Sequence, residues 1–292
     1  MRSFPTEVVE VAEIAGLLKA ACSNADRVLE GRIKLRSLDD WMRCKKLLPE
    51  RSKHLQEILT EIRIRGFVDP MVGRISANEI GATEALREGL LARGVNSRQR
   101  AVLRTLTHRG ARVDSRIYGA EAVTSLALRL RGTFPYFLGS EYTADGAARA
   151  SLFPIPYQDL TDLTLPSDSF DFVTTNEVLE HVPDIDAALR SIARVLKPGG
   201  WHIGTVPFHY ESRVGVVKAR LINGKIEHLT TPEYHGNPFE SGGSLVFELP
   251  GWDILARAIR VGFSEAFMEF TWSAEFGIVA EELGVFLLTL RR

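Results

Sequence analysis

The sequence has few cysteines and no long hydrophobic run, and each absence excludes a class of protein. Cys22 and Cys44 are the only cysteines among 292 residues, too few for a disulfide framework or a metal knuckle, which fits a reducing cytoplasm. No segment approaches the roughly 20 apolar residues that span a bilayer. The first residues carry three glutamates and no continuous apolar core, so they do not resemble a signal peptide. We expect a soluble, cytoplasmic protein with no membrane partner.

An excess of charge of either sign is also missing. The 36 Lys and Arg residues nearly balance the 37 Asp and Glu residues, which leaves a formal net charge of -1. The protein as a whole therefore produces no field that attracts nucleic acid or anionic lipid. A nucleic-acid substrate is disfavoured, although a local basic patch remains compatible with one.

Residues 1–110 are polar and lack the alternation that is typical of strands. Their apolar residues recur at helical spacing, which predicts helices around 8–18, 47–62 and 79–93 and, after an Asn96 cap, at 97–107. We interpret this segment as a helical region that forms either a lid over the acceptor or the surface of a homodimer.

From residue 111 to residue 292, short apolar strands alternate with helices, which predicts an α/β fold with a parallel sheet. The predicted strands are 116–118, 136–140, 154–157, 170–175 and 201–206, followed by a final pair at 266–271 and 285–290. The predicted helices are 121–131, 185–196 and 252–261.

Three motifs between residues 165 and 200 form the most specific pattern of the chain. LPSDSFDFV at 165–173 leads into NEVLEHVP at 176–183, and RVLKPGG at 194–200 opens the next strand. In order and spacing these motifs resemble those of class I S-adenosylmethionine-dependent methyltransferases. The resemblance implies a Rossmann-like sheet of seven strands, mostly parallel with a C-terminal antiparallel strand, and an insertion at about 208–250 that forms the acceptor pocket.

A nucleoside cofactor needs acidic anchors at the carboxyl ends of the strands. Glu141 ends the second predicted strand, where a carboxylate can accept both ribose hydroxyls, as in dinucleotide-binding folds. The resemblance implies that Asp159 binds the adenine amino group and that the next backbone N–H, of Leu160, binds the ring. The alternative role for either acid is a surface cap or turn. The cofactor residues that we predict are Tyr118, Gly119, Ala120, Glu121, Glu141, Tyr142, Asp159, Leu160, Asn176 and Glu177.

The loop after the first strand departs from that family's pattern. Members usually have a glycine-rich loop there, whereas RIYGAEAVT at 116–124 contains one glycine. Because this cofactor has an amino-acid tail and no phosphate to cradle, Gly119 and Ala120 can suffice, and Glu121 is expected to bind the ammonium group. The alternative is a weak or inactive cofactor site, which would make the chain a catalytically silent partner or scaffold module.

Glu177, Glu180 and His181 form an E-x-x-E-H pattern. It resembles the divalent-metal motif of ubiquinone-pathway O-methyltransferases and small-RNA 2′-O-methyltransferases, in which a downstream histidine completes the site. Here His209, His228 and His235 are available for that position, and Glu177, Glu180, His181 and His235 are the metal-ligand candidates. Such a mixed carboxylate and imidazole set does not select one metal. The same pattern also occurs in methyltransferases that use no metal.

The competing mechanism is metal-free general-base catalysis by His181, His209 or His235, because histidine has a suitable pKa for deprotonating a hydroxyl. His209 and His235 lie in the insertion after the fifth strand, where this fold builds its acceptor pocket. The insertion is rich in aromatic, Gly and Pro residues, which suits a polar small molecule or a saccharide.

The segments PEYHG at 232–236 and GWDIL at 251–255 resemble bacterial methyltransferases of glycan and natural-product pathways. In such relatives the residues before NSRQRAVL are often rich in cysteine, whereas residues 66–94 contain none, so we predict no structural zinc. The sequence thus favours O-methylation of a small molecule or saccharide in a biosynthetic pathway. A silent module is the second hypothesis and a nucleic-acid methyltransferase the third.

Overall fold

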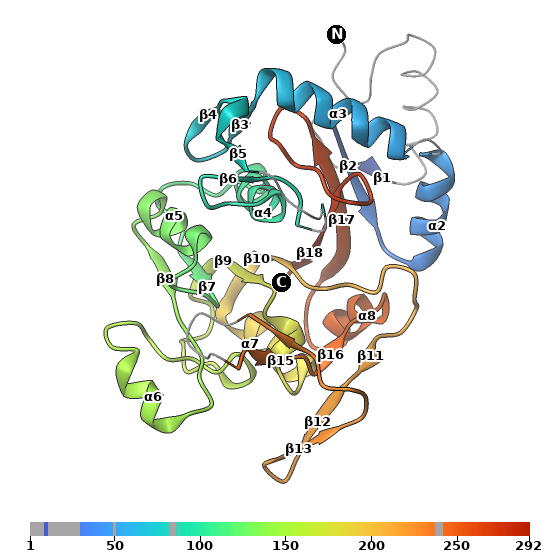
Figure 1. Cartoon of the computed structure of the whole chain (residues 1–292). Helices are drawn as coiled ribbons and strands as arrows, with labels where there is room; N and C mark the ends of the chain where they lie inside the picture. The colour runs from blue at the N-terminus through green and yellow to red at the C-terminus, as the bar shows by residue number, and fades with distance from the viewer. Residues whose placement is uncertain (1–8, 11–29, 49–50, 82–85, 87, 237–241) are drawn as a thin grey trace. The chain divides into compact units, whose positions relative to one another are not determined.

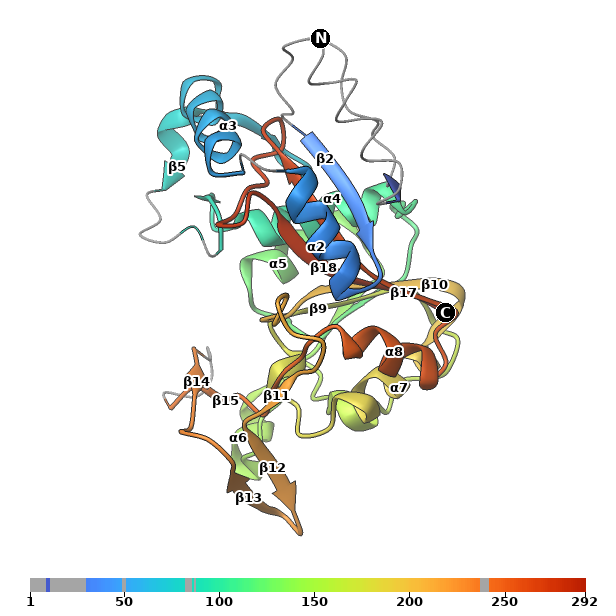
Figure 2. The ribbon, with the colours of Figure 1, turned by 90° about the vertical axis from the view of Figure 1, so that its right-hand side faces the viewer.

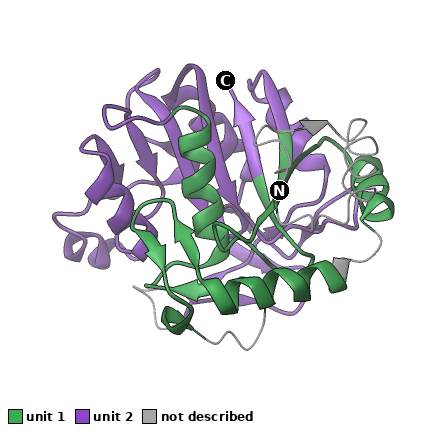
Figure 3. Cartoon of the chain, turned by 90° about the horizontal axis from the view of Figure 1, so that it is seen from above, with its two compact units in different colours: residues 1–110, 267–287 green, residues 111–266, 288–292 purple. Residues whose placement is uncertain are grey.

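The computed structural model describes residues 9–10, 30–48, 51–81, 86, 88–236 and 242–292. The chain divides into two compact units, which Figure 3 colours separately. Unit 1 comprises residues 1–110 and 267–287, and unit 2 comprises residues 111–266 and 288–292. No helix within the described ranges combines the length and the apolar character that crossing a membrane requires.

The core of unit 2 is a sheet with the strand order β8-β7-β9-β10-β18. Its strands are β7 (Ile117–Gly119), β8 (Phe137–Gly139), β9 (Phe170–Asn176), β10 (Leu196–Thr205) and the end of β18 (Val285–Arg291). The first four run parallel, and β18 runs antiparallel to β10. The predicted α/β class is confirmed, including its antiparallel C-terminal strand. Because parallel strands end at one edge, the loops after β7, β8 and β9 meet there.

Three helices of unit 2 begin at residues whose side chains accept hydrogen bonds from first-turn N–H groups. Thr124, Asp145 and Asp184 cap α5 (Ser125–Thr133), α6 (Gly146–Ser151) and α7 (Ile185–Val195) in this way. α7 buries Ile185, Ala188, Leu189 and Ile192, the spacing of one helical face. The remaining helical segments of the unit are η2 (Leu160–Asp162), η3 (Leu179–His181) and α8 (Asp253–Arg260).

The insertion after β10 is built from short antiparallel strand pairs. They are β11 (Val216–Val217) with β16 (Glu248–Leu249), β12 (Ala219–Ile222) with β13 (Lys225–His228), and β14 (Tyr234–His235) with β15 (Ser244–Leu245). Asn223 and Gly224 connect β12 to β13 with φ values of 49° and 74°, the turn geometry that matches the twist of a hairpin. This hairpin projects from the rest of unit 2 in both views (Figures 1 and 2).

Unit 1 contains strands as well as helices. Its helices are α2 (Leu38–Leu47), α3 (Arg51–Arg65), η1 (Ala77–Glu79) and α4 (Ser97–His108). Its strands are β1 (Val9–Glu10), β2 (Glu30–Leu35), β3 (Phe67–Asp69), β4 (Gly73–Ile75), β5 (Ile80–Gly81), β6 (Leu91–Ala92) and most of β17 (Glu265–Ser273). β2 pairs in parallel with β1 and antiparallel with β17. The helix predicted at 97–107 is confirmed as α4, with Asn96 as its N-cap.

The prediction that residues 1–110 contain no strand is wrong, most clearly at β2. Arg32 on this strand is 2% exposed, and its guanidinium forms an ion pair with the fully buried Glu269 of β17. Arg109 pairs with the same carboxylate at 3.0 Å. A charged residue on a buried face hides the period-2 pattern, because the acid that neutralises it lies 237 residues away in the sequence.

Two further predicted elements are corrected. Residues 80–81 and 91–92, predicted within a helix at 79–93, pair instead as β5 and β6. Gly89 has a φ of 72°, and a Cβ at that position would lie 2.1 Å from the carbonyl oxygen of Val279, so a regular helix does not fit there. The strand predicted at 154–157 is reduced to one parallel bridge between Glu141 and Tyr157. Nearly all of the helix predicted at 8–18 lies outside the described residues. The same holds for residues 82–85 and 87 of the helix predicted at 79–93.

Candidate functional site

Polar side chains from three strand ends meet at the carboxyl edge of the unit 2 sheet. Glu121 follows β7, Glu141 follows β8, and Asn176 ends β9. Glu121 is 6% exposed, and its carboxylate accepts hydrogen bonds from Asn176 Nδ2 and Thr124 Oγ1. Burial raises the pKa of Glu121 above its usual value despite these hydrogen bonds. The structure thus brings Glu121 and Asn176, two of the predicted cofactor residues, into direct contact.

Glu141 binds the loop that stands where the glycine-rich turn was expected. Its Oε1 accepts hydrogen bonds from the N–H of Ala122 at 2.7 Å and from the N–H of Val123 at 3.3 Å. Burial raises the pKa of this carboxyl as well. A Cβ on Gly139 would lie 2.6 Å from the carbonyl oxygen of Glu121, so the loop packs directly on β8. A carboxylate and a close backbone contact therefore order the loop in which glycines are scarce.

Asp159 and Tyr142 lie on the segments that follow β8. Asp159 Oδ1 accepts hydrogen bonds from the backbone N–H of Thr161 at 2.9 Å and from its hydroxyl at 2.7 Å, which makes it the N-cap of η2. Leu160, the next residue, is 5% exposed. Tyr142 is half exposed and stacks on Tyr157 with ring centroids 5.8 Å apart. The site thus combines a capping carboxylate with an accessible aromatic face.

Tyr118, Gly119 and Ala120 form the end of β7 and the turn after it. The ring of Tyr118 is 1% exposed, its hydroxyl lies 2.8 Å from Ser140 Oγ, and burial raises its pKa to about 12. The N–H of Ala120 donates to the carbonyl of Thr174 at 3.1 Å. The phenol ring of Tyr118 therefore packs in the core, and the turn is tied to β9.

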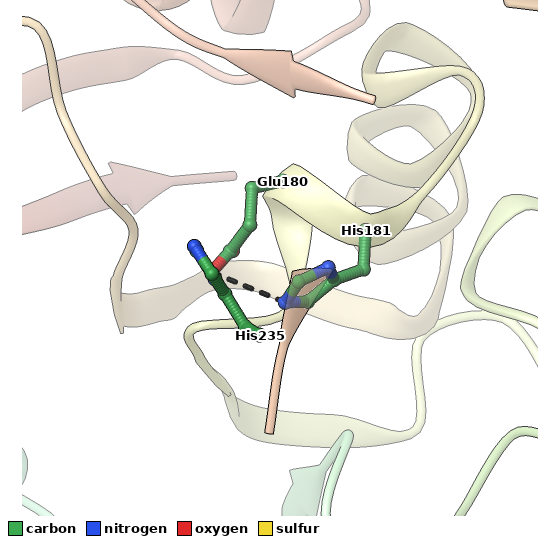
Figure 4. A group of neighbouring side chains, drawn as sticks. All are labelled: Glu180, His181 and His235. Atoms are coloured by element: carbon green, nitrogen blue, oxygen red, sulfur yellow. Dashed lines mark ion pairs between the residues drawn. The ribbon is translucent and has the colours of Figure 1, made fainter. Parts of the chain in front are cut away.

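Glu180, His181 and His235 form a second cluster. Within the described part of the chain, one ligand atom from each of them lies within 4.8 Å of the others. His181 Nε2 is 3.4 Å and His235 Nδ1 is 3.5 Å from Oε1 of Glu180, whose side chain is fully buried. Figure 4 shows the three side chains pointing toward one another, two from η3 and one from β14. One carboxylate oxygen and two imidazole nitrogens thus converge on one point.

Hydrogen bonds on the far side of each imidazole fix its orientation. His181 Nδ1 lies 2.9 Å from the carbonyl oxygen of Leu245. His235 Nε2 lies 3.1 Å from Oε1 of Glu233, and Lys218 Nζ pairs with Oε2 of the same carboxylate. Burial lowers the pKa of His181, which favours the neutral form of this ring. Histidines that ligate metals are oriented by such partners, and the donor set suits several divalent ions.

The structure separates the other predicted catalytic and metal residues from this cluster. Glu177 follows β9 with a φ of 53° and is not one of the three clustered residues. His228 is exposed on β13, and His209 donates its backbone N–H to the carbonyl of Pro250. Sequence reasoning missed Glu233 and Lys218. The position of Glu233 two residues before His235 was a usable signal, since residues i and i+2 of an extended segment share a face.

Residues 139–204 match the model of a family described as the methyltransferase domain. Similar curated proteins include two ubiquinone biosynthesis O-methyltransferases. The one from Paracidovorax citrulli (strain AAC00-1) is 41% identical over 58 residues, which is 19% of this chain and 24% of that protein. The one from Xanthomonas oryzae pv. oryzae (strain PXO99A) is 66% identical over 32 residues, 11% of this chain and 13% of that protein. Each match therefore covers only a short part of either protein.

The solved structures that resemble parts of the chain include two methyltransferases. An S-adenosylmethionine dependent methyltransferase from Mesorhizobium loti is 20% identical with a TM-score of 0.39, covering 66% of this chain and 98% of that chain. An N-methyltransferase from Haemonchus contortus is 16% identical with a TM-score of 0.37, covering 58% of this chain and 38% of that chain. The segment matched by the family model lies entirely within unit 2 and contains Glu141, Asn176, Glu180 and His181.

Proposed function

We propose that the chain transfers a methyl group from S-adenosylmethionine to a hydroxyl oxygen of a small molecule or saccharide, because residues 139–204 match the model of a methyltransferase domain. The reaction is an in-line displacement at the methyl carbon of a sulfonium, in which the enzyme chiefly aligns the nucleophile and excludes water. The observation that carries the proposal is the family match over 139–204, since this segment contributes residues to both clusters described above.

The acids at the sheet edge support the position of the cofactor. In this proposal Glu141 accepts the ribose hydroxyls, Asp159 faces the adenine, and Glu121 binds the ammonium group of the methionine part. Glu121 is buried beside two neutral donors, Thr124 and Asn176, and a cation next to it would compensate the buried negative charge. The stacked ring of Tyr142 offers an apolar face to the purine.

The second cluster supports a divalent cation that holds the acceptor. A neutral His181 that donates Nδ1–H to Leu245 presents a lone pair on Nε2, and a neutral His235 that donates Nε2–H to Glu233 presents one on Nδ1. Two lone pairs and a carboxylate oxygen within 4.8 Å of one another suit a divalent ion. Such an ion, when bound, lowers the pKa of a hydroxyl that coordinates it. His181, His235 and Glu180 would hold the ion beside the acceptor hydroxyl.

Ubiquinone biosynthesis O-methyltransferases are among the similar proteins, which supports an oxygen nucleophile on a small molecule. The near balance of positive and negative residues supports a small-molecule acceptor over nucleic acid.

Calorimetric titration of the full chain with S-adenosylhomocysteine tests the cofactor site. Glu141→Gln and Asp159→Asn should each weaken binding about 10-fold to 100-fold, because a hydrogen bond to a charged group contributes about 1.5–3 kcal/mol. Asp162→Asn, a change of an exposed acid in the same 3-10 helix as Leu160, is the matched control and should leave the affinity unchanged. No heat and no thermal shift at millimolar cofactor would contradict the enzyme and favour a silent module.

Titration with Mn²⁺, followed by electron paramagnetic resonance, tests the metal cluster. Glu180→Gln and His235→Ala should abolish tight binding, whereas His228→Ala, at an exposed histidine outside the cluster, should bind Mn²⁺ like the unchanged protein. If the unchanged protein binds no Mn²⁺ and methylation persists in chelator, the metal is excluded. His181 or His235 would then be the general base.

A further inference from the structure

The two nitrogens of His235 face two different carboxylates. Nδ1 lies 3.5 Å from Oε1 of Glu180, and Nε2 lies 3.1 Å from Oε1 of Glu233. The second oxygen of Glu233 pairs with Lys218 Nζ. Lys218, Glu233 and His235 therefore form a continuous chain of polar contacts that ends at the buried Glu180.

We propose that Glu233, held by Lys218, is a positioning residue that fixes the tautomer of His235 and so selects Nδ1 as its metal-ligating atom. The inference rests on the proposed metal-assisted function. It assigns a role to Lys218 and Glu233, two residues of the insertion that lie outside the cluster of Glu180, His181 and His235.

The chemistry of imidazole supports this assignment. A neutral ring carries one proton, and both nitrogens of His235 have a carboxylate neighbour. The proton stays on the nitrogen that makes the closer hydrogen bond, which is Nε2 at 3.1 Å from Glu233 and not Nδ1 at 3.5 Å from Glu180. Glu233 thus holds the proton on Nε2 and leaves the lone pair on Nδ1, which faces Glu180. His181 has the opposite arrangement, because its Nδ1 is the atom next to the Leu245 carbonyl and its Nε2 faces Glu180. The two rings reach one point with opposite tautomers.

The backbone of the insertion holds this chain of contacts in place. The N–H of Lys218 donates to the carbonyl of Phe247 at 2.7 Å, and the N–H of Val246 donates to the carbonyl of Glu233 at 2.9 Å. Phe247 in turn donates its N–H to the carbonyl of Glu180 at 2.7 Å. Segment 244–249, which contains β15 and β16, therefore ties the lysine, the glutamate and the buried acid together through main-chain bonds. An exposed ion pair alone contributes little, but this one is fixed at both ends.

Long-range ¹H–¹⁵N correlation spectra of the metal-free full chain at mildly alkaline pH read the tautomers directly. The unchanged protein should show His235 protonated on Nε2 and His181 protonated on Nδ1. In Glu233→Ala, His235 should become a mixture of tautomers while His181 keeps its pattern, and Glu233→Gln should restore most of the Nε2–H form because its amide oxygen still accepts. Lys218→Met should give an intermediate result.

The matched controls are Glu227→Gln and Lys225→Met, which make similar changes at exposed positions of β13. Both should leave the His235 spectrum unchanged. A His235 that keeps pure Nε2–H in Glu233→Ala would overturn the proposal, as would a pure Nδ1–H form in the unchanged protein. Because these spectra contain no metal, the result stands whether or not the metal proposal survives.

Mn²⁺ affinity supplies the second readout. Loss of an outer partner of a metal-ligating histidine typically weakens metal binding about 10-fold to 100-fold, which is the loss expected for Glu233→Ala, with most of the affinity retained in Glu233→Gln. Unchanged affinity in Glu233→Ala would refute the positioning role. No binding to the unchanged protein would refute the metal proposal alone, and the tautomer spectra would then decide the role of Glu233.

Discussion

His202 provides a direct measure of the electrostatic cost of burial in the unit 2 sheet. It lies on β10 with no exposed surface, and its Nε2 is 2.8 Å from Thr175 Oγ1. Burial lowers the pKa of this ring from 6.5 to about 3. The folded protein keeps the ring neutral, while the unfolded chain binds a proton as the pH falls below 6.5. Above pH 6.5 the buried neutral ring of His202 therefore costs no stability. As the pH falls from 6.5 toward 3, the folded state progressively loses stability relative to the unfolded chain, which alone can bind the proton.

The size of this effect follows from the pKa difference. Each pH unit below the unfolded pKa costs about 1.4 kcal/mol until the folded pKa is reached, so the loss at about pH 5 is roughly 2 kcal/mol. In His202→Gln the amide can still bond Thr175 and does not titrate. Between about pH 7.5 and about pH 5, urea unfolding followed by circular dichroism should show a loss roughly 2 kcal/mol smaller in this variant than in the unchanged protein. His228→Gln, at an exposed histidine, should behave like the unchanged protein. Equal losses in His202→Gln and the unchanged protein would refute the reasoning.

Three further changes test the fold and the loop at the sheet edge. Glu269→Gln should lower the free energy of unfolding by about 3–5 kcal/mol, because it leaves the buried guanidinium of Arg32 without its counter-charge. Urea denaturation measures this change, and a loss below about 1 kcal/mol would contradict the expectation. Gly139→Ala should lower the free energy of unfolding by about 1–3 kcal/mol and weaken S-adenosylhomocysteine binding, because the new Cβ would lie 2.6 Å from the carbonyl oxygen of Glu121. An unchanged affinity in calorimetry would show that the loop does not bind the cofactor. Asp184→Ala removes the N-cap of α7 and should lower the melting temperature, with a loss of about 1 kcal/mol, whereas Arg190→Ala, at an exposed position of the same helix, should leave it unchanged.

Much of unit 2 could be predicted because its elements carry local signals. The strands predicted at 116–118, 136–140 and 170–175 agree with β7, β8 and β9 within one residue at each end, since short apolar segments bounded by turn residues mark them. The strand predicted at 201–206 is longer in the structure, where β10 begins at Leu196. Helix α7 agrees with the helix predicted at 185–196, and the structure adds Asp184 as the cap of a segment with one apolar face. The failure at 154–157 has a local cause too, because Pro154 and Pro156 remove backbone donors from any strand there.

Unit 1 was harder to predict because its stability depends on contacts between distant segments. Arg32 interrupts the alternation of apolar and polar residues in β2. Its burial is explained only by the ion pair with Glu269 of β17. Gly31 of β2 also has no local signal of a strand, yet a Cβ there would lie 2.3 Å from the ring of Trp272. The partner strand β17 matches the strand predicted at 266–271, but nothing local to β2 indicates that the two segments pair.

The sequence alone determined the parallel sheet, the two acids at the strand ends and the motif that contains Glu180 and His181, because these features depend on neighbours within a few residues. His209, His228 and His235 all follow the motif, and only the tertiary structure shows that His235 lies beside Glu180 and His181. Its position depends on how β14 pairs with β15, which the sequence does not indicate. The same pairing brought Glu233 and the Leu245 carbonyl to the far sides of the two imidazoles. The orientation of a histidine is set by what its second nitrogen contacts, and a contact across an insertion of some 40 residues exists only once the chain has folded.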